Sequence, residues 1–211
     1  MTLTLRYMRP SDIARVVDID KQSFPTPWSA RSYQYEVKES NYSHMLVLEA
    51  LTEQPATGWR RLIRGFSKSA NGQSESPPME RKRTMVGYGG LWHIMEEAHI
   101  STIATAPEAR GQGYGELLLS AMVKRSITLG ASYVVLEVRV SNLVAKRLYE
   151  KYAFSIVDTK RNYYRDNGED AYDMRLDLED SATVASFEVL FAQVKQRQQF
   201  IDEYSQLKRK K

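Results

Sequence analysis

Residues 97–131 have the sequence EAHISTIATAPEARGQGYGELLLSAMVKRSITLGA, and this stretch determines the fold that the rest of the chain completes. The pattern predicts a strand that ends before Pro107, a glycine-rich turn and then a helix. The turn is Arg110–Gly115, where three glycines within five residues leave the backbone N–H groups unobstructed. The first turn of a helix adds unpaired N–H groups and a partial positive charge. Together these features predict a binding site for a phosphate or pyrophosphate.

The spacing of the glycines narrows the kind of phosphate ligand. The run R-G-Q-G-Y-G is not the dinucleotide fingerprint, which also needs an acidic residue at the end of the next strand. It is not a Walker loop, because no Gly-Lys-Ser/Thr follows. It matches the pattern Arg/Gln-x-x-Gly-x-Gly/Ala.

The next segment, YVVLEVRVSNLVAKRLYE at residues 133–150, predicts a central strand that is apolar before Glu137. A helix over 142–152 follows, with Ser141 or Asn142 as its cap.

Together these motifs resemble the GNAT superfamily of N-acetyltransferases, in which such a loop holds the pyrophosphate of acetyl-CoA. Residues 136–154 resemble the RimI-type branch, which acetylates the N-terminal α-amines of proteins. The runs RNYY (161–164) and GEDAYDM (168–174) resemble the same branch and its archaeal Ard-type members. The resemblance covers roughly residues 3–178. It implies an α/β (α+β) GNAT fold, with a mixed, mostly antiparallel central sheet flanked by helices.

An insertion interrupts this fold after a predicted strand at His44–Ala50. The polar, turn-rich composition of Thr52–Arg83 predicts a long, flexible hairpin insertion, in which Trp59–Phe66 could extend the strands. A tolerated surface insertion is favoured over a cover for the substrate or a contact with a partner.

Residues 179–211 lie beyond the acetyltransferase domain expected at 1–178. They predict an extra C-terminal helix, docked on the domain or on a second subunit. The closing Lys208–Lys211 is favoured as a solvated end over a contact with ribosomal RNA. The apolar residues at helical spacing are Phe187, Leu190, Phe191, Val194, Ile201 and Tyr204.

The composition excludes several kinds of site. The chain of 211 residues has no cysteine, so disulfides, thiolate nucleophiles and cysteine-ligated zinc are excluded. The three histidines, His44, His93 and His99, are scattered, which favours partly buried strand residues over a metal site. No apolar run approaches ~18 residues and no signal peptide is recognised, so we expect a cytoplasmic protein without a membrane span. A net charge of +4, much of it in the last five residues, gives little support to nucleic-acid binding.

Acetyl transfer from a thioester to an amine requires a held cofactor, a neutral amine, a donor for the oxyanion and a proton for the leaving thiolate. The resemblance implies acetyl-CoA as the co-substrate and no metal. Backbone groups at the end of the strand would pair with the pantetheine arm and are a plausible source of the oxyanion donor. Asn142 is expected to contact the cofactor, to cap its helix, or both. The residues expected to bind acetyl-CoA are Ile103, Ala104, Thr105, Arg110, Gly111, Gln112, Gly113, Tyr114, Gly115 and Asn142.

Glu137 and Tyr149 are the candidate catalytic residues. Glu137 follows an apolar run in a central strand, so a lone carboxylate there should have a raised pKa and act as the general base. The alternative is a structural ion pair with Arg139 on the same strand face. Tyr149 lies two helical turns after Asn142 and would protonate the thiolate of coenzyme A. A tyrosine packed in the core is the alternative, and the resemblance favours catalysis in both cases.

The expected acceptor is a protein or peptide N-terminus. An α-amine has a pKa of about 7.7–8.0, against about 10.4 for lysine. A single carboxylate base can therefore deprotonate an α-amine more easily near neutral pH. Phe24 and Trp28 are either one wall of the acceptor groove or residues that fix a loop. Tyr163 and Tyr164 resemble the family's clamp on the first backbone groups of the acceptor. A ribosomal protein is a possible acceptor, and we expect a monomer or a homodimer.

Two other functions compete with this hypothesis. The same fold serves acetyltransferases of small-molecule amines or protein lysines, with the same cofactor motifs and a different acceptor pocket. A non-catalytic acyl-CoA-binding protein is the third possibility, and the presence of both Glu137 and Tyr149 argues against it.

Overall fold

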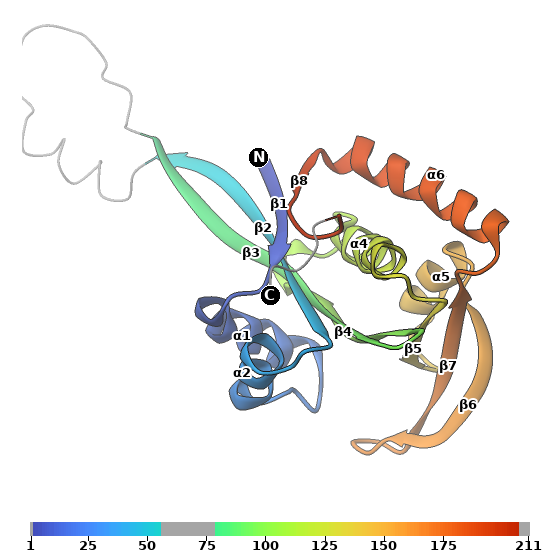
Figure 1. The fold of residues 1–211 in the computed structure, drawn as a ribbon. Helices are drawn as coiled ribbons and strands as arrows, with labels where there is room; N and C mark the ends of the chain where they lie inside the picture. The colour runs from blue at the N-terminus through green and yellow to red at the C-terminus, as the bar shows by residue number, and fades with distance from the viewer. Residues whose placement is uncertain (1, 56–78, 207–211) are drawn as a thin grey trace, which may run out of the picture.

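The structure is a computed structural model that describes residues 2–55 and 79–206 (Figure 1). Helices flank one central sheet, as expected for the α/β (α+β) fold. In chain order the elements are β1 (Thr2–Tyr7), the 3-10 helix η1 (Pro10–Asp12), α1 (Ile13–Ser23), α2 (Ala30–Lys38), β2 (Ser43–Pro55), β3 (Met79–Ile94), β4 (Glu97–Thr105), η2 (Pro107–Ala109), α4 (Tyr114–Leu129), β5 (Tyr133–Arg139), α5 (Leu143–Lys151), β6 (Ser155–Tyr164), β7 (Glu169–Asp177), α6 (Ser181–Gln198) and β8 (Phe200–Asp202).

Helices cover both faces of the sheet. The pair α1 and α2 lies on one side, and α4 and α6 lie on the other (Figure 1). Helix α4 is the most deeply buried of these, since Leu117, Leu118 and Met122 have no exposed surface. Burial of such side chains is the main favourable term in folding. The core therefore holds the glycine-rich turn, which leads into α4, in a fixed position.

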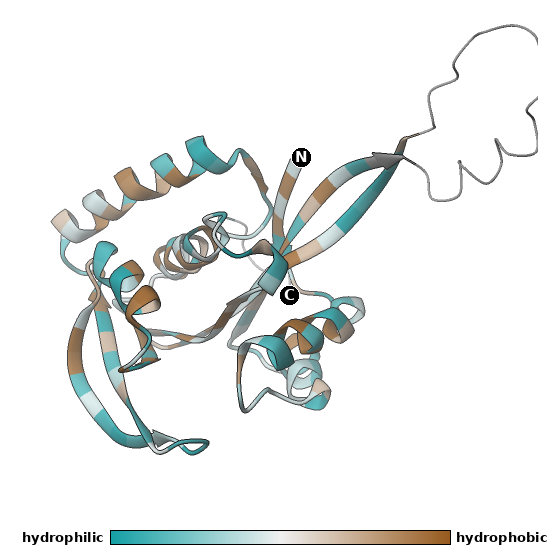
Figure 2. Cartoon of the chain, turned by 180° about the vertical axis from the view of Figure 1, so that it is seen from behind, coloured by the Kyte–Doolittle hydropathy of each residue, from teal (hydrophilic) through white to brown (hydrophobic). Residues whose placement is uncertain are grey.

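Helix α6 is amphipathic, with apolar and polar segments alternating along its length (Figure 2). Its buried residues are Phe187, Phe191 and Val194, as the helical spacing predicts. The prediction that the helix continues to Tyr204 is wrong. The helix ends at Gln198, because Gln199 adopts a left-handed conformation with φ 45°, and the chain continues as β8. The basic end at Lys208–Lys211 lies outside the described residues.

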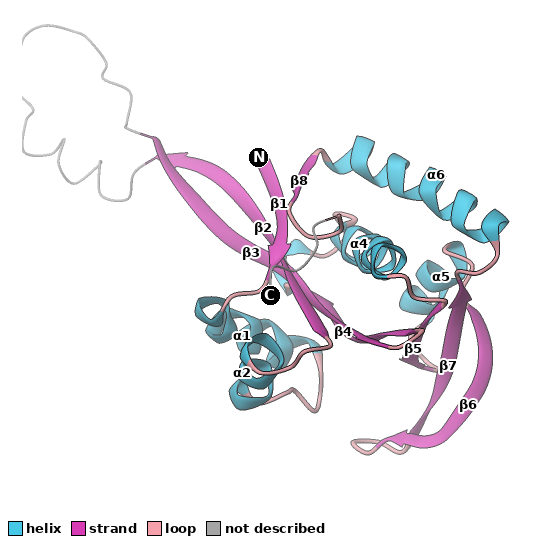
Figure 3. Cartoon of the chain, in the orientation of Figure 1, coloured by secondary structure: helices cyan, strands magenta, loops and turns pink. Residues whose placement is uncertain are grey.

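The sheet has eight strands in the order β6-β7-β5-β4-β3-β2-β1-β8 (Figure 3). Within the described residues, only the β4–β5 and β1–β8 pairs are parallel. The β4–β5 pairing is short and stops at His99↔Val135. The two strands continue past that point without pairing, so the last six residues of β4 keep one free edge. This divergence in the middle of the sheet leaves backbone groups available to a ligand.

The hairpin insertion is more regular at its base than predicted. Strands β2 and β3 pair from Ser43↔Trp92 to Pro55↔Met79, so residues 52–55 and 79–83 are paired strand and not loop. The remaining residues 56–78, including Trp59–Phe66, lie outside the described part of the chain.

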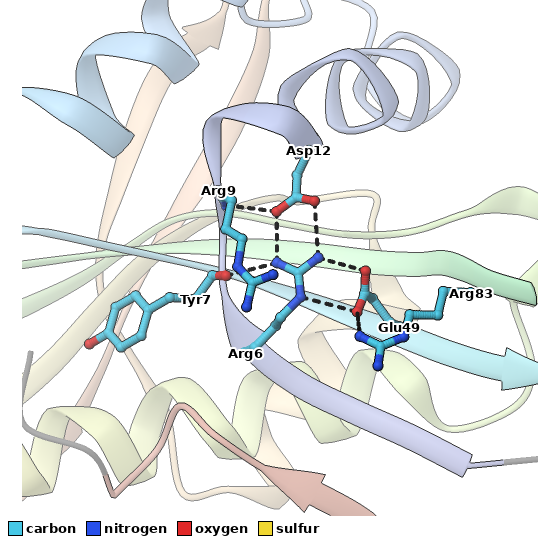
Figure 4. Close-up of polar contacts among 6 residues, drawn as sticks. All are labelled: Arg6, Tyr7, Arg9, Asp12, Glu49 and Arg83. Carbon is cyan, nitrogen blue, oxygen red and sulfur yellow. Dashed lines mark hydrogen bonds and ion pairs between the residues drawn. The ribbon is translucent and has the colours of Figure 1, made fainter.

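A buried ion cluster fixes β1 to the start of α1 (Figure 4). The Arg6 guanidinium donates to the Asp12 carboxylate at 2.7 and 3.0 Å and to the Glu49 carboxylate at 2.6 and 3.0 Å. Asp12 also accepts the backbone N–H of Arg9, as a helix-capping residue does. Arg83 is a more distant partner of Glu49, at 3.8 Å. The cluster joins four segments and leaves the opposite end of the sheet free for the site described next.

No helix in the part of the chain that the structure describes is long and apolar enough to cross a membrane.

Candidate active site

The glycine loop, residues 110–115, enters α4 in a conformation that needs glycine. Gly111 has φ 76° and Gly113 has φ 80°, both in the left-handed region. A Cβ atom at Gly111 or Gly115 would meet no atom within 4 Å. The N–H groups of the first turn, Tyr114–Glu116, have no acceptor within the helix. The loop therefore fits an anionic diphosphate, which backbone N–H groups bind at a helix N-terminus.

Two side chains of the loop point elsewhere. Tyr114 is buried in the core, so only its backbone is available to a ligand. The Arg110 guanidinium donates to the Ser23 hydroxyl of α1 at 3.4 Å.

The edge of β4 that faces β5 lies beside the glycine loop. Ile103, Ala104 and Thr105 pair with β3 on their other side. Beyond His99, no β5 residue pairs with them in the described structure. These are the backbone groups that the sequence assigns to the pantetheine arm, and their free edge agrees with that assignment.

Glu137 is not the lone carboxylate that the sequence predicts. Its Oε2 lies 2.8 Å from Nε2 of His99, and its Oε1 accepts from the Lys160 ammonium at 2.6 Å. Burial opposes ionisation, but the hydrogen bonds from His99 and Lys160 outweigh it and lower the pKa of Glu137 to about 2. The predicted raised pKa is therefore wrong. Arg139, the expected alternative partner, pairs with Asp166 and Glu169 instead.

A row of aromatic side chains connects this carboxylate with the α1–α2 segment. The His99 ring meets Trp92 edge-on at 5.4 Å, and Trp92 stacks on Trp28 at 6.0 Å. The Trp28 backbone N–H donates to Asp20 at 2.6 Å, which fixes the loop. Phe24 packs, partly buried, against the core. The contact with Asp20 confirms that Trp28 fixes the loop, and its place in a wall of the acceptor groove stays a prediction.

Tyr149 and Asn142 lie on α5, after the end of β5. The Asn142 side chain accepts the N–H of Ala145 at 3.1 Å, so the predicted cap is confirmed. Tyr149 is 6% exposed and packs against Phe154. Burial raises the pKa of Tyr149 above the ordinary value of a phenol. Its hydroxyl makes no hydrogen bond within the described residues, so the O–H is available as a donor.

The β6–β7 hairpin brings Tyr163 and Tyr164 to the other side of Glu137. The Arg139 guanidinium stacks on the Tyr164 ring at 3.8 Å and is fixed by Asp166 and Glu169. Tyr163 is 45% exposed, with the Lys160 ammonium 5.8 Å from its ring. The ring of Tyr164 is thus held by Arg139, whereas much of Tyr163 is exposed, and their role as a clamp on the acceptor stays a prediction.

Sequence reasoning missed three members of this cluster: His99, Lys160 and Asp173, whose carboxylate accepts from Lys160 at 2.9 Å. They come from β4, β6 and β7. Only the strand pairing brings them together, so no local motif marks them.

Comparisons with known proteins agree with this arrangement. The model of a family described as the acetyltransferase (GNAT) family matches residues 13–154. A Bacillus subtilis protein, provisionally named a [ribosomal protein bS18]-alanine N-acetyltransferase, is 35% identical over 167 residues, which are 79% of this chain and 90% of that protein. An N-alpha-acetyltransferase of Saccharolobus solfataricus is 30% identical over 172 residues, 80% of this chain and 89% of that protein.

The fold also has a close match among solved structures. One match is the crystal structure of the ribosomal-protein-S18-alanine N-acetyltransferase from Escherichia coli, with a TM-score of 0.62. The superposition covers 84% of this chain and 94% of the Escherichia coli chain. At 23% sequence identity this likeness shows the fold alone.

Proposed function

The chain belongs to the acetyltransferase (GNAT) family, and from this premise we propose that it transfers the acetyl group of acetyl-CoA to the N-terminal α-amine of a protein. The acetyl-CoA-dependent reaction is that of the family. The protein acceptor is supported by the Bacillus subtilis and Saccharolobus solfataricus relatives, one named for a ribosomal-protein alanine and the other for N-alpha acetylation. A ribosomal protein is the first acceptor to test.

One observation carries the proposal. The free edge of β4 and the glycine loop fit acetyl-CoA. The His99–Glu137 pair lies where β4 and β5 diverge, between Trp28 on one side and the tyrosines of the β6–β7 hairpin on the other. This arrangement supports an acceptor site beside the acid–base groups, with Trp28, Tyr163 and Tyr164 as the residues proposed to line it.

The His99–Glu137 pair is proposed to take the proton from the acceptor. A carboxylate with a pKa of about 2 stays ionised at neutral pH and is a weak base by itself. The His99 imidazole is a common kind of general base, and the carboxylate beside it fixes the orientation of the ring. An α-amine, with a pKa of about 7.7–8.0, needs only this modest help. The neutral amine nitrogen then forms a bond with the thioester carbonyl carbon.

Tyr149 is proposed to supply the proton for the leaving group. When the carbon–sulfur bond breaks, the coenzyme A thiolate needs one proton. The raised pKa of Tyr149 keeps its hydroxyl protonated at neutral pH, and the O–H has no other acceptor among the described residues.

Acetyl-CoA turnover on short peptides tests the proposal. Each peptide carries a free N-terminus and an internal lysine, and a copy with a blocked N-terminus is its control. We expect turnover on free N-termini and none on blocked copies, with the N-terminus of a ribosomal protein included in the set. Glu137→Gln should lower kcat about 100-fold or more. Turnover that survives blocking would assign lysine as the acceptor. No turnover on any peptide, with acetyl-CoA still bound, would point to a small amine or a folded protein as the acceptor.

A further inference from the structure

Helix α6 reaches the glycine loop with its last turn. Nε2 of Gln198 donates to the carbonyl oxygen of Gln112 at 2.9 Å. One residue earlier, the Arg197 guanidinium lies 3.0 Å from the Glu116 carboxylate, in the first turn of α4. Both contacts come from residues beyond 13–154, the part of the chain that the family model matches. The C-terminal helix therefore contributes to a loop that the rest of the domain builds.

Gly113 shows how close this contact is. A Cβ atom at Gly113 would lie 2.7 Å from Nε2 of Gln198, whereas one at Gly111 or Gly115 would meet nothing within 4 Å. Gly111 and Gly115 thus border open space, whereas the missing side chain at Gly113 leaves space for the Gln198 amide. The absence of a side chain at Gly113 serves the helix as well as the backbone turn.

The position of α6 is itself fixed at several points. Phe187 and Phe191 are buried, their rings stack at 5.8 Å, and Phe187 also contacts Tyr152. Glu116 receives the Lys151 ammonium at 2.5 Å and the Tyr152 hydroxyl at 3.0 Å, in addition to Arg197. After Gln199 the chain returns to the sheet as β8. The Gln198 amide is therefore presented from a fixed support and not from a free end.

We propose that Gln198 is a positioning residue for acetyl-CoA: its amide fixes the Gln112 carbonyl and so keeps the neighbouring N–H groups directed at the pyrophosphate. The proposal rests on the proposed function, because it assigns the glycine loop to acetyl-CoA. A loop ordered before binding does not lose that entropy on binding, so the contact contributes to affinity and not to the chemical step.

Calorimetric acetyl-CoA binding and steady-state kinetics test the proposal. Gln198→Ala should raise Kd and KM for acetyl-CoA about fivefold, the worth of one hydrogen bond, with kcat and the KM for peptide unchanged. Gln198→Glu should raise them further, because a carboxylate cannot donate to the carbonyl and repels the phosphates. Gln196→Ala is the matched control, an exposed glutamine of the same helix, and should bind like the wild type.

A double variant separates this contact from a general loss of structure. Gly113→Ala alone places its methyl group against Gln198, so Gly113→Ala with Gln198→Ala should bind acetyl-CoA no more weakly than Gly113→Ala alone. Equal acetyl-CoA affinity of Gln198→Ala and the wild type would overturn the proposal, and so would fully additive losses in the double variant. A wild-type chain that does not bind acetyl-CoA would instead overturn the proposed function.

Discussion

Lys160 holds the carboxylate that the proposed reaction needs. Its ammonium lies between Glu137 and Asp173, and it is one of the two groups that keep Glu137 ionised. An incoming α-ammonium carries the same charge and donor geometry as this lysine. Lys160 therefore occupies one oxygen of Glu137, and His99 occupies the other.

Lys160→Met should raise the pKa of Glu137 above about 2, because burial, which favours the neutral carboxyl, is then opposed by His99 alone. A depressed carboxyl pKa gives stability that is present above the unfolded pKa of about 4.3 and is lost as pH falls through the folded pKa. In the variant this contribution is smaller, and its loss is complete at a higher pH because the folded pKa is higher. Carbon NMR of the Glu137 carboxyl measures the shift, with Lys160→Arg as a control that retains the charge. An unchanged titration midpoint would contradict the prediction.

Among the elements, β1 depends most on a buried charge. Arg6 is 5% exposed and binds two carboxylates, so Arg6→Met leaves Asp12 and Glu49 buried without their partner. Breaking such a cluster should lower the free energy of unfolding by about 3–5 kcal/mol, measured by urea denaturation.

The β2–β3 hairpin, which contributes Glu49 to the Arg6 cluster, offers a control for this measurement. Arg81 pairs with Glu53 at 3.2 Å, and the exposed fractions of the two side chains are 74% and 57%. Arg81→Met should therefore cost less than about 1 kcal/mol. If Arg6→Met and Arg81→Met lower the free energy of unfolding equally, burial is not the reason why the Arg6 cluster stabilises the fold.

Local features of the elements were predictable from the sequence. The glycine-rich turn before α4 and the cap at Asn142 depend on a few neighbouring residues, and the structure confirms both. The end of α6 was not predictable, since the apolar spacing continues past Gln199 and no glycine or proline marks the stop.

The ion pairs of Glu137 were not predictable for a different reason. His99 is 38 residues away and Lys160 is 23 residues away, and only strand pairing brings them to the carboxylate. The sequence shows that Glu137 lies in a central strand, but not which charged residues the neighbouring strands place beside it.

At the scale of the whole molecule, the described residues include a buried charge without an ion-pair partner, in the last third of α4. Arg125 has no exposed surface, and its three guanidinium nitrogens have no hydrogen-bond partner within the described residues. The Arg125 guanidinium carbon lies 5.5 Å from the centroid of the Tyr7 ring. Such a cation–π interaction contributes about 0.5–2 kcal/mol. Burial of a charge costs more than that.

Arg125→Met should therefore keep the free energy of unfolding or raise it by up to about 4 kcal/mol, the range found when buried charges are replaced by apolar side chains. Urea denaturation at neutral pH measures it, with Arg6→Met as the opposite case. A loss of more than about 2 kcal/mol would contradict the prediction and would indicate a counter-ion bound beside Arg125.

The parallel pairing of β8 with β1 has a consequence for the order in which the protein is made. Residues 3–5 are synthesised well before residues 200–202, which supply the partner of their outer edge. An unpaired strand edge is a template for association with other chains, and folding during synthesis proceeds from the N-terminus. The nascent chain therefore carries an open edge at β1 while all the residues between β1 and β8 are translated, which gives chaperones that shield strand edges time to act there.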